Sequence, residues 1–131
     1  MLTLVRGLPG AGKSTYAKSL EGLHIESDQY FVINGKYVFD HRRLSAAHVW
    51  CFETFEKALK TGMDVCVSNT FTQYWEIEPY IELAKKCKFP YQIVEVRTSF
   101  GSVHAVPEEK MEAMRKRWED FSEMEEVIIV E

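Results

Sequence analysis

Short apolar runs alternate along the chain with longer segments in which apolar residues recur at helical spacing. The first run, residues 2–5, stops before Gly7, as expected of a short buried strand. We predict strands at 2–5, 24–26, 65–67, 91–96 and 127–130. Aromatic residues on both sides of Asn34-Gly35 indicate either a hairpin or an irregular loop over 31–39.

Helical spacing is clearest between residues 42 and 60, where apolar side chains form a broad face. We expect that face to contain Leu44, Ala47, Val49, Trp50, Phe52, Phe55 and Leu59. Further helices are predicted over 13–20, 75–86 and 107–121, the last beginning at Pro107. Four residues of that last helix have helical spacing and are expected in the core: Met111, Met114, Trp118 and Phe121.

Strand and helix follow each other in turn, which predicts an α/β fold. We expect a single domain over residues 1–131, with a parallel sheet of about five strands and helices on both faces. In such sheets ligands bind beyond the carboxyl ends of the strands. Candidate chemistry is therefore expected at that edge.

Composition narrows the possible functions. Apolar residues make up 46% of the chain, enough for a core, and the formal net charge is −4. This acidic balance argues against an extended surface for duplex nucleic acid and leaves room for a small site that takes a strand end. The three cysteines have no metal-ligand spacing, which indicates a reducing compartment, and Cys66 is expected to be a buried thiol. No apolar run is long enough for a membrane span and no signal-peptide pattern is present, so we predict a soluble cytoplasmic protein.

A glycine-rich loop after the first predicted strand matches G-x-x-x-x-G-K-[ST], the P-loop pattern. We expect the phosphates of ATP to be bound by Gly7, Pro9, Gly10, Ala11, Gly12, Lys13, Ser14 and Thr15. The glycines permit backbone angles that turn N–H groups inward, and Lys13 would place its ammonium on the β and γ phosphates as a catalytic group. Ser14 would hold Mg²⁺, and Thr15 would reach the α-phosphate. The flanking strand and helix argue against a chance glycine turn and predict a three-layer P-loop NTPase or kinase fold.

Phosphoryl transfer also needs a group that takes the proton of the acceptor, and Asp28 is the candidate. It follows the second predicted strand at the same edge as the P-loop; the alternative is a carboxylate that caps a helix or turn. The third strand leads into Ser68-Asn69-Thr70, without the aspartate with which hydrolysing NTPases hold Mg²⁺. That favours a kinase with Asp28 near the metal. Asn69 and Thr70 either bind acceptor or phosphate, or cap the helix near residue 75.

Longer stretches of the sequence resemble a known family. Residues 6–15 fit R-G-L-P-G-[SA]-G-K-S-T, and residues 27–31 fit the looser region [ST]-[DT]-D-[DQ]-Y-F. Further matches are residues 35–50 with G-x-Y-x-F-[DN]-x₃-L-x₂-A-H-x-W, residues 69–76 with N-T-N-T-x-x-W-E, and residues 103–107 with V-H-G-V-P. Over about residues 2–121 the chain thus resembles small P-loop kinases of the polynucleotide 5′-kinase group. Within that group it is similar to the kinase module of the NEDD4-binding protein 2 family and to short bacteriophage relatives labelled AAA-family ATPases.

The resemblance implies an ATP-dependent kinase whose acceptor is the 5′-hydroxyl end of DNA or RNA. It implies Asp28 as the general base and places Asn69 near the acceptor. Polynucleotide kinases carry an acceptor-binding arginine where this chain has Phe31, and the lid of larger relatives holds another arginine near the position of Gly101.

Other cations are candidates for the missing ones. His104 lies in the expected lid, where it is either a contact to phosphate of the substrate or an ordinary loop residue. Arg97 and Arg117 are further candidates. Arg117 belongs to the basic run 115–117, which is either a solvated helix face or, because Arg117 precedes Trp118-Glu119 as in the family's R-[YW]-E, a source of a nucleotide-binding residue. His48, on the long helix, is either a hydrogen-bonded structural residue or a substrate contact.

Three functions stay open. The first is a kinase that moves the γ-phosphate of ATP to a 5′-hydroxyl polynucleotide end. The second is a kinase for nucleosides or another small molecule, which the acidic charge and Phe31 favour. The third is an ATP-binding regulatory module with little catalysis, which the missing lid arginine favours.

Overall fold

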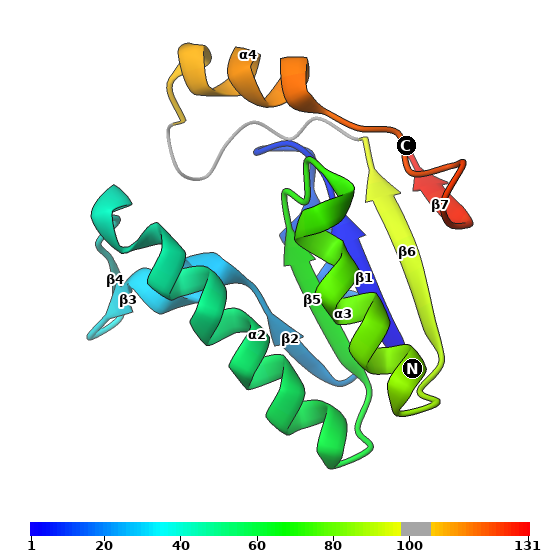
Figure 1. Ribbon diagram of the computed structural model, residues 1–131. Helices are drawn as coiled ribbons and strands as arrows, with labels where there is room; N and C mark the ends of the chain where they lie inside the picture. The colour runs from blue at the N-terminus through cyan, green and yellow to red at the C-terminus, as the bar shows by residue number, and fades with distance from the viewer. Residues whose placement is uncertain (98–105) are drawn as a thin grey trace.

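The computed structural model describes residues 1–97 and 106–131. Its centre is a five-stranded sheet with the order β2-β5-β1-β6-β7, in which every neighbouring pair is parallel (Figure 1). The strands are β1 (Leu2–Arg6), β2 (Leu23–Ile25), β5 (Val65–Asn69), β6 (Tyr91–Val96) and β7 (Val127–Val130). The expected α/β fold with a parallel five-stranded sheet is confirmed.

The helices follow the predicted order. They are α1 (Lys13–Lys18), α2 (Leu44–Lys60), α3 (Tyr74–Lys86) and α4 (Glu108–Arg117), with short 3₁₀ helices η1 (Ser27–Phe31) and η2 (His41–Arg43). The segment around Asn34-Gly35 is a hairpin of β3 (Val32–Ile33) and β4 (Lys36–Tyr37), not an irregular loop. Among the described residues, no helix combines the length and the apolar character needed to cross a membrane.

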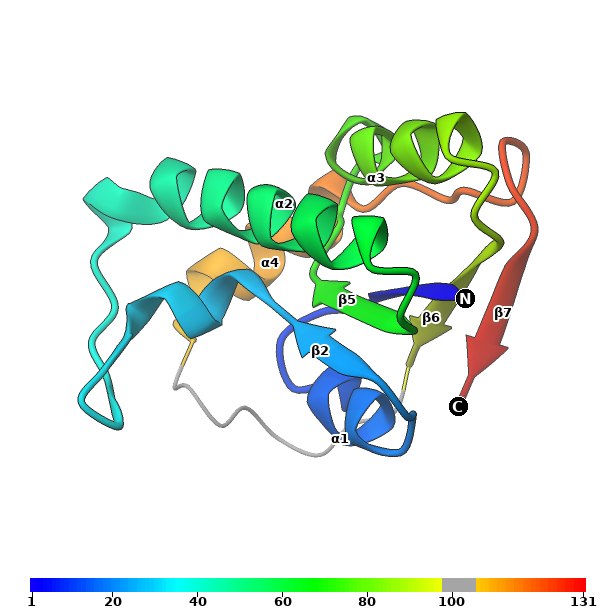
Figure 2. The same ribbon diagram turned by 90° about the horizontal axis from the view of Figure 1, so that it is seen from below.

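The molecule has three layers. Helices α2 and α3 cover one face of the sheet and α1 lies on the other, as the view from below shows (Figure 2). The larger core lies under α2 and α3 and includes Phe55, Ile77 and Ile81, whereas a smaller one under α1 includes Ala17 and Val94. Helix α4 crosses the carboxyl ends of the strands (Figure 1).

Two predictions about the core were wrong. In α2, Leu44 and Val49 are 41% and 56% exposed. Ala47 and Cys51, on either side of Val49, are fully buried, so Val49 lies outside the face that packs on the core. The last helix ends at Arg117 instead of Phe121, since Trp118 already has an extended ψ of 123°. Met111 and Met114 on α4 are only partly buried, and so is Trp118 beyond it, whereas Phe121 reaches the core from the segment that follows α4.

Candidate active site

The phosphate loop connects β1 to α1 and depends on its glycines. Gly10 and Gly12 have φ of 82° and 97°, a left-handed conformation that other residues adopt only with strain. Gly7 allows a close approach, because a Cβ there would lie 2.9 Å from the carbonyl oxygen of Val96. The backbone N–H of Ala11 donates to the carbonyl of Leu8 at 3.0 Å and closes the turn. The local sequence therefore folds into a glycine-dependent loop of the kind that binds anionic phosphate.

Lys13 lies over this loop. Its Nζ donates to the carbonyl oxygens of Gly7 and Leu8 at 2.9 and 3.1 Å. Burial lowers the pKa of Lys13 to about 8, and the charges of Glu26 and Asp28 oppose that shift. The ammonium is thus held at the loop, with two carboxylates close enough to affect it.

Ser14, the predicted metal ligand, contacts a carboxylate that the sequence analysis did not single out. Its Oγ donates to Oε2 of Glu26, directly after β2, at 3.2 Å. The same carboxylate oxygen accepts a hydrogen bond from Oγ of Ser68 on β5 at 3.1 Å. Thr15, one residue further along α1, is exposed. The structure therefore brings an acid from β2 to the hydroxyl that the P-loop pattern assigns to Mg²⁺.

A histidine completes the contacts of Glu26. His24 Nε2 lies 2.7 Å from Oγ of Ser68 and 3.5 Å from Oε2 of Glu26. Burial alone would raise the pKa of Glu26, but the contacts with His24, Ser68 and Ser14 outweigh it and lower the pKa below its ordinary value. Glu26 is therefore ionised at neutral pH.

Asp28, the predicted general base, lies in η1, directly beyond β2. Residue 26 occupies the N-cap position of η1, and Asp28 lies in the first turn of this helix. Asp28 is half-buried and hydrogen-bonds Tyr37 of the hairpin. Burial and the charge of Asp28 raise the pKa of Tyr37 to about 12. The carboxylate is thus placed between the phosphate loop and the hairpin.

Asn69 ends β5 and holds the start of η1. Its Oδ1 accepts a hydrogen bond from the backbone N–H of Ser27 at 2.9 Å, one residue before Asp28. Thr70 follows, half-buried, at the same sheet edge. Neither residue caps α3, because Gln73 takes that position. Asn69 therefore lies next to the candidate base, in contact with its backbone segment.

The predicted cations lie in different places. Arg117 is exposed at the end of α4, and its Nε donates to Oγ1 of Thr72 at 3.1 Å, which keeps it near the carboxyl edge of β5. Arg97 pairs with Glu95 at 2.6 Å. His104 lies outside the described residues. His48 Nδ1 lies 3.0 Å from Oγ of Ser27, which agrees with a hydrogen-bonded structural residue, although His48 is exposed.

An aromatic group adjoins Asp28. We call it the hairpin aromatic cluster; it contains Tyr30, Phe31, Tyr37, Phe39 and Trp50, with ring centroids 5.1 to 6.4 Å apart. Phe31 is only 2% exposed and lies inside the cluster. On its surface, Arg43 donates to the hydroxyl of Tyr30 at 2.7 Å and lies 5.0 Å from the centroid of that ring. The position at which polynucleotide kinases carry an arginine is thus a core position here. Arg43, the last residue of η2, places a guanidinium nearby.

Arg6, the last residue of β1, is fully buried directly before the phosphate loop. Its guanidinium donates to the carbonyl oxygens of Phe71 at 3.0 Å and Thr72 at 3.3 Å, and to Oε1 of Glu95 at 3.3 Å. Burial lowers the pKa of Arg6 to about 10, and Glu95 opposes that shift, so the group is charged at neutral pH. Phe71 has a φ of 44°, which is unusual for a bulky residue, and Arg6 holds its carbonyl in place.

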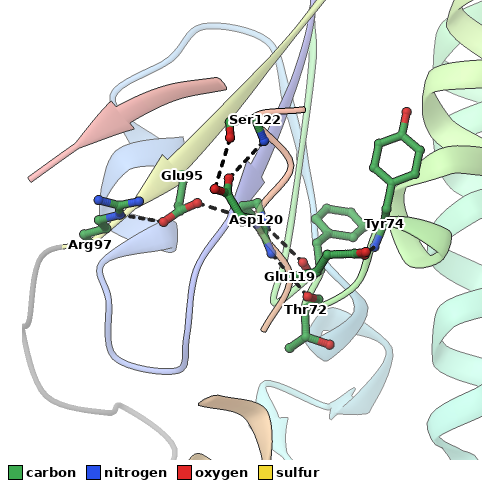
Figure 3. Close-up of polar contacts among 9 residues, drawn as sticks. Thr72, Tyr74, Glu95, Arg97, Glu119, Asp120 and Ser122 are labelled. Carbon is green, nitrogen blue, oxygen red and sulfur yellow. Dashed lines mark hydrogen bonds and ion pairs between the residues drawn. The ribbon is translucent and has the colours of Figure 1, made fainter. Parts of the chain in front are cut away.

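The segment after α4 packs onto Arg6. The rings of Trp118 and Phe121 have centroids 3.8 and 3.5 Å from its Cζ. Glu119 accepts a hydrogen bond from the backbone N–H of Tyr74 at 2.6 Å, and nearby Glu95 pairs with Arg97 (Figure 3). These contacts fix the segment across the carboxyl edge of the sheet, beside the phosphate loop.

The residues present fit ATP and Mg²⁺. The loop offers N–H groups and a lysine to phosphates, while Ser14 and Glu26 offer oxygen atoms, the donors that Mg²⁺ prefers. Within residues 1–97 and 106–131, no group of three or more histidine, cysteine, aspartate or glutamate side chains is arranged to hold a metal. Such a site is ordinary for Mg²⁺, which takes one or two carboxylates and completes its shell with substrate phosphates and water.

Comparisons with known proteins agree with this geometry. A family model described as an AAA domain matches residues 2–113. Human NEDD4-binding protein 2 is 34% identical over 139 aligned positions, which cover 92% of this chain. The chain spans only 8% of the length of that relative.

Solved structures share the fold at low sequence identity. Kti12 of Chaetomium thermophilum, solved with ADP-AlF3, has a TM-score of 0.65 and 14% identity and covers 99% of this chain and 88% of its own. A sugar kinase from Janibacter sp. HTCC2649 has a TM-score of 0.66 and 16% identity, with coverages of 98% and 83%. A chain of the Pnkp1/Rnl/Hen1 complex has a TM-score of 0.59 and 14% identity, with coverages of 86% and 38%. The α/β fold with a parallel five-stranded sheet therefore matches the fold of these solved structures.

Proposed function

Because the chain belongs to the AAA domain family, we propose that it is a P-loop kinase that moves the γ-phosphate of ATP to a hydroxyl. The acceptor that we propose is the 5′-hydroxyl end of a polynucleotide. The likeness to NEDD4-binding protein 2 and to kinases of the same fold supports the proposal. The observation that carries it is Asp28, a carboxylate beyond β2 at the sheet edge that bears the phosphate loop.

The site divides the reaction among few groups. Lys13 and the loop N–H groups would bind the β and γ phosphates, and Ser14 would hold Mg²⁺, which supplies positive charge beside them. Asp28 would accept the proton of the acceptor hydroxyl as its oxygen bonds to the γ-phosphorus. The bond from that phosphorus to the bridging oxygen breaks, and ADP leaves with the electron pair.

The surface next to Asp28 suits the end of a single strand. Aromatic side chains stack with bases of any sequence, and arginine binds the phosphates between them. Arg43 with Tyr30 offers both on the hairpin aromatic cluster. Trp75, 70% exposed at the start of α3, offers a second ring at the same sheet edge.

Transfer of label tests the proposal. The chain is incubated with γ-labelled ATP, Mg²⁺ and short DNA or RNA bearing a 5′-hydroxyl. Asp28→Asn should lower the rate by about 10²- to 10⁴-fold, the usual contribution of a general base. Asp64→Asn is the matched control, since exposed Asp64 lies before β5 at the opposite edge of the sheet. Absence of label on both nucleic acids in the wild type would overturn the assignment of the acceptor.

A kinase for nucleosides or another small molecule is the second candidate. Its support is Phe31, which fills a core position where a polynucleotide kinase has its acceptor-binding arginine. The same assay with nucleosides and small alcohols decides between the two. Label on a nucleoside, with none on oligonucleotides, would replace the first candidate by the second.

A further inference from the structure

The hydroxyl of Ser14 faces an acid that comes from an unexpected strand. P-loop NTPases hold Mg²⁺ with the P-loop serine or threonine and an aspartate of a neighbouring strand. In this chain β5, the neighbour of β1 on that side, has Ser68 near its end, and Ser68 is 1% exposed. Glu26, directly after the neighbouring strand β2, supplies a carboxylate there instead, and its Oε2 accepts hydrogen bonds from both Ser14 and Ser68.

We infer that Glu26 is the carboxylate of the Mg²⁺ site, delivered from β2 in place of an acid on β5, with Ser68 and His24 as its positioning residues. The inference rests on the proposed function, because the metal arrives with ATP. It adds to the P-loop a metal-binding residue that the P-loop pattern does not contain.

The geometry fits an octahedral ion. Mg²⁺ binds oxygen at about 2.0–2.1 Å, so two neighbouring ligands of an octahedron lie about 2.9 Å apart. Ser14 Oγ and Glu26 Oε2 are already 3.2 Å apart. Both oxygen atoms can therefore face one ion after a shift of a few tenths of an ångström.

The surroundings of Glu26 hold it in one orientation. Ser68 donates to its Oε2 at 3.1 Å, and His24 Nε2 lies 2.7 Å from the Ser68 hydroxyl. The backbone N–H of Glu26 donates to Oε1 of Gln29 at 3.2 Å, which fixes the chain where β2 passes into η1. A carboxylate fixed in this way binds a metal without first losing side-chain freedom. A purely structural Glu26 would stabilise η1 as well, so the test has to separate metal binding from stability.

A measurement of metal affinity separates a role in metal binding from a role in stability. The full chain is saturated with ATP, and its affinity for Mn²⁺, a spectroscopic substitute for Mg²⁺, is measured by electron paramagnetic resonance. Glu26→Gln should weaken Mn²⁺ binding about 100-fold, and ATP binding without metal should stay equal or become tighter, because a negative charge leaves the phosphate site. Glu21→Gln makes the same chemical change at an exposed residue and should leave both affinities unchanged.

The outcomes distinguish this inference from the proposed function. A folded Glu26→Gln protein that binds Mn²⁺ as tightly as the wild type would overturn the inference and leave the kinase proposal standing. A wild type that binds no ATP would overturn the kinase proposal itself. Ser68→Ala keeps the carboxylate and removes one orienting hydrogen bond, so it serves if Glu26→Gln fails to fold. It should weaken Mn²⁺ about tenfold, and an unchanged affinity would count against the inference.

Discussion

The burial of a charged arginine at the end of β1 leads to a quantitative prediction. Arg6→Met keeps a long unbranched side chain and removes the guanidinium. The substitution takes away three hydrogen bonds and the contacts with the rings of Trp118 and Phe121. We therefore expect a large loss of stability from one buried group.

The magnitude follows from what the lost partners retain. The Thr72 carbonyl keeps the backbone N–H of Glu119 at 2.8 Å, and Glu95 keeps Arg97 at 2.6 Å, whereas the carbonyl of Phe71 loses the donor that holds it. A buried carbonyl without a partner costs about 1–3 kcal/mol. Each cation–ring contact contributes about 0.5–2 kcal/mol. Allowing for the volume that methionine fills, we expect a loss of about 3–5 kcal/mol, the range found when a buried ion pair is broken.

Urea unfolding measures this difference, and a loss of that size corresponds to a fall in melting temperature of roughly 10–20 °C. Arg115→Met is the matched control: Arg115 pairs with glutamates on the surface of α4, and its loss should leave the unfolding midpoint unchanged. A cycle with Glu95→Gln should give a coupling of about 1–2 kcal/mol between the two residues. If Arg6→Met unfolds at the same urea concentration as the wild type, the reasoning from the buried network is wrong.

Three further predictions concern single residues. In the nucleotide-free protein Lys13 should lose its proton near pH 8, about two pH units below the pKa of an ordinary lysine, so ATP affinity should fall as the pH rises above 8. NMR titration of ¹³C-methylated lysines measures this pKa, and a midpoint above pH 10 for Lys13 would contradict the prediction. Burial raises the pKa of the Cys66 thiol to about 12, so maleimide should modify exposed Cys87 and spare Cys66 at neutral pH. Mass spectrometry locates the label, and equal modification of the two cysteines would refute the prediction. Phe71→Gly should be more stable than Phe71→Ala by about 1 kcal/mol in urea unfolding, because of the positive φ; the reverse order would show that this backbone is not strained.

The strands were predictable where apolar residues form short runs. The bounds of β6 and β7 agree with the prediction at both ends, whereas β5 continues to Asn69. The run of apolar residues stops at Val67, and the last two residues of β5 are polar. Ser68 is buried all the same, because Glu26 and His24 supply partners that lie far away in the sequence.

The end of α4 shows where periodicity misleads. Trp118 and Phe121 continue the helical spacing, yet the chain leaves the helix at Trp118. Their rings pack on Arg6, more than a hundred residues earlier, and this contact favours the extended backbone over another helical turn. Spacing alone carries no information about such a partner.

For the candidate site, the sequence indicated the residues of one contiguous motif but not the contacts between distant elements. The phosphate loop is a contiguous motif, so Lys13 and Ser14 could be assigned from local sequence. The contact of Asp28 with Tyr37 and that of Ser14 with Glu26 join residues on separate elements. They depend on how α1 packs beside the end of β2 and how η1 packs on the hairpin, and a single sequence does not contain that arrangement in local form.

The central position of β1 constrains how the chain folds as the ribosome makes it. β1 is synthesised before both strands that flank it, β5 and β6. Until β6 emerges, one edge of β1 lacks a partner strand, and its backbone N–H and C=O groups stay open to pairing with other nascent strands. Arg6 waits longer still, since its ring partners Trp118 and Phe121 leave the ribosome after β6. A nascent chain stopped short of residue 118 therefore already contains the phosphate loop but leaves Arg6 at its base without those rings.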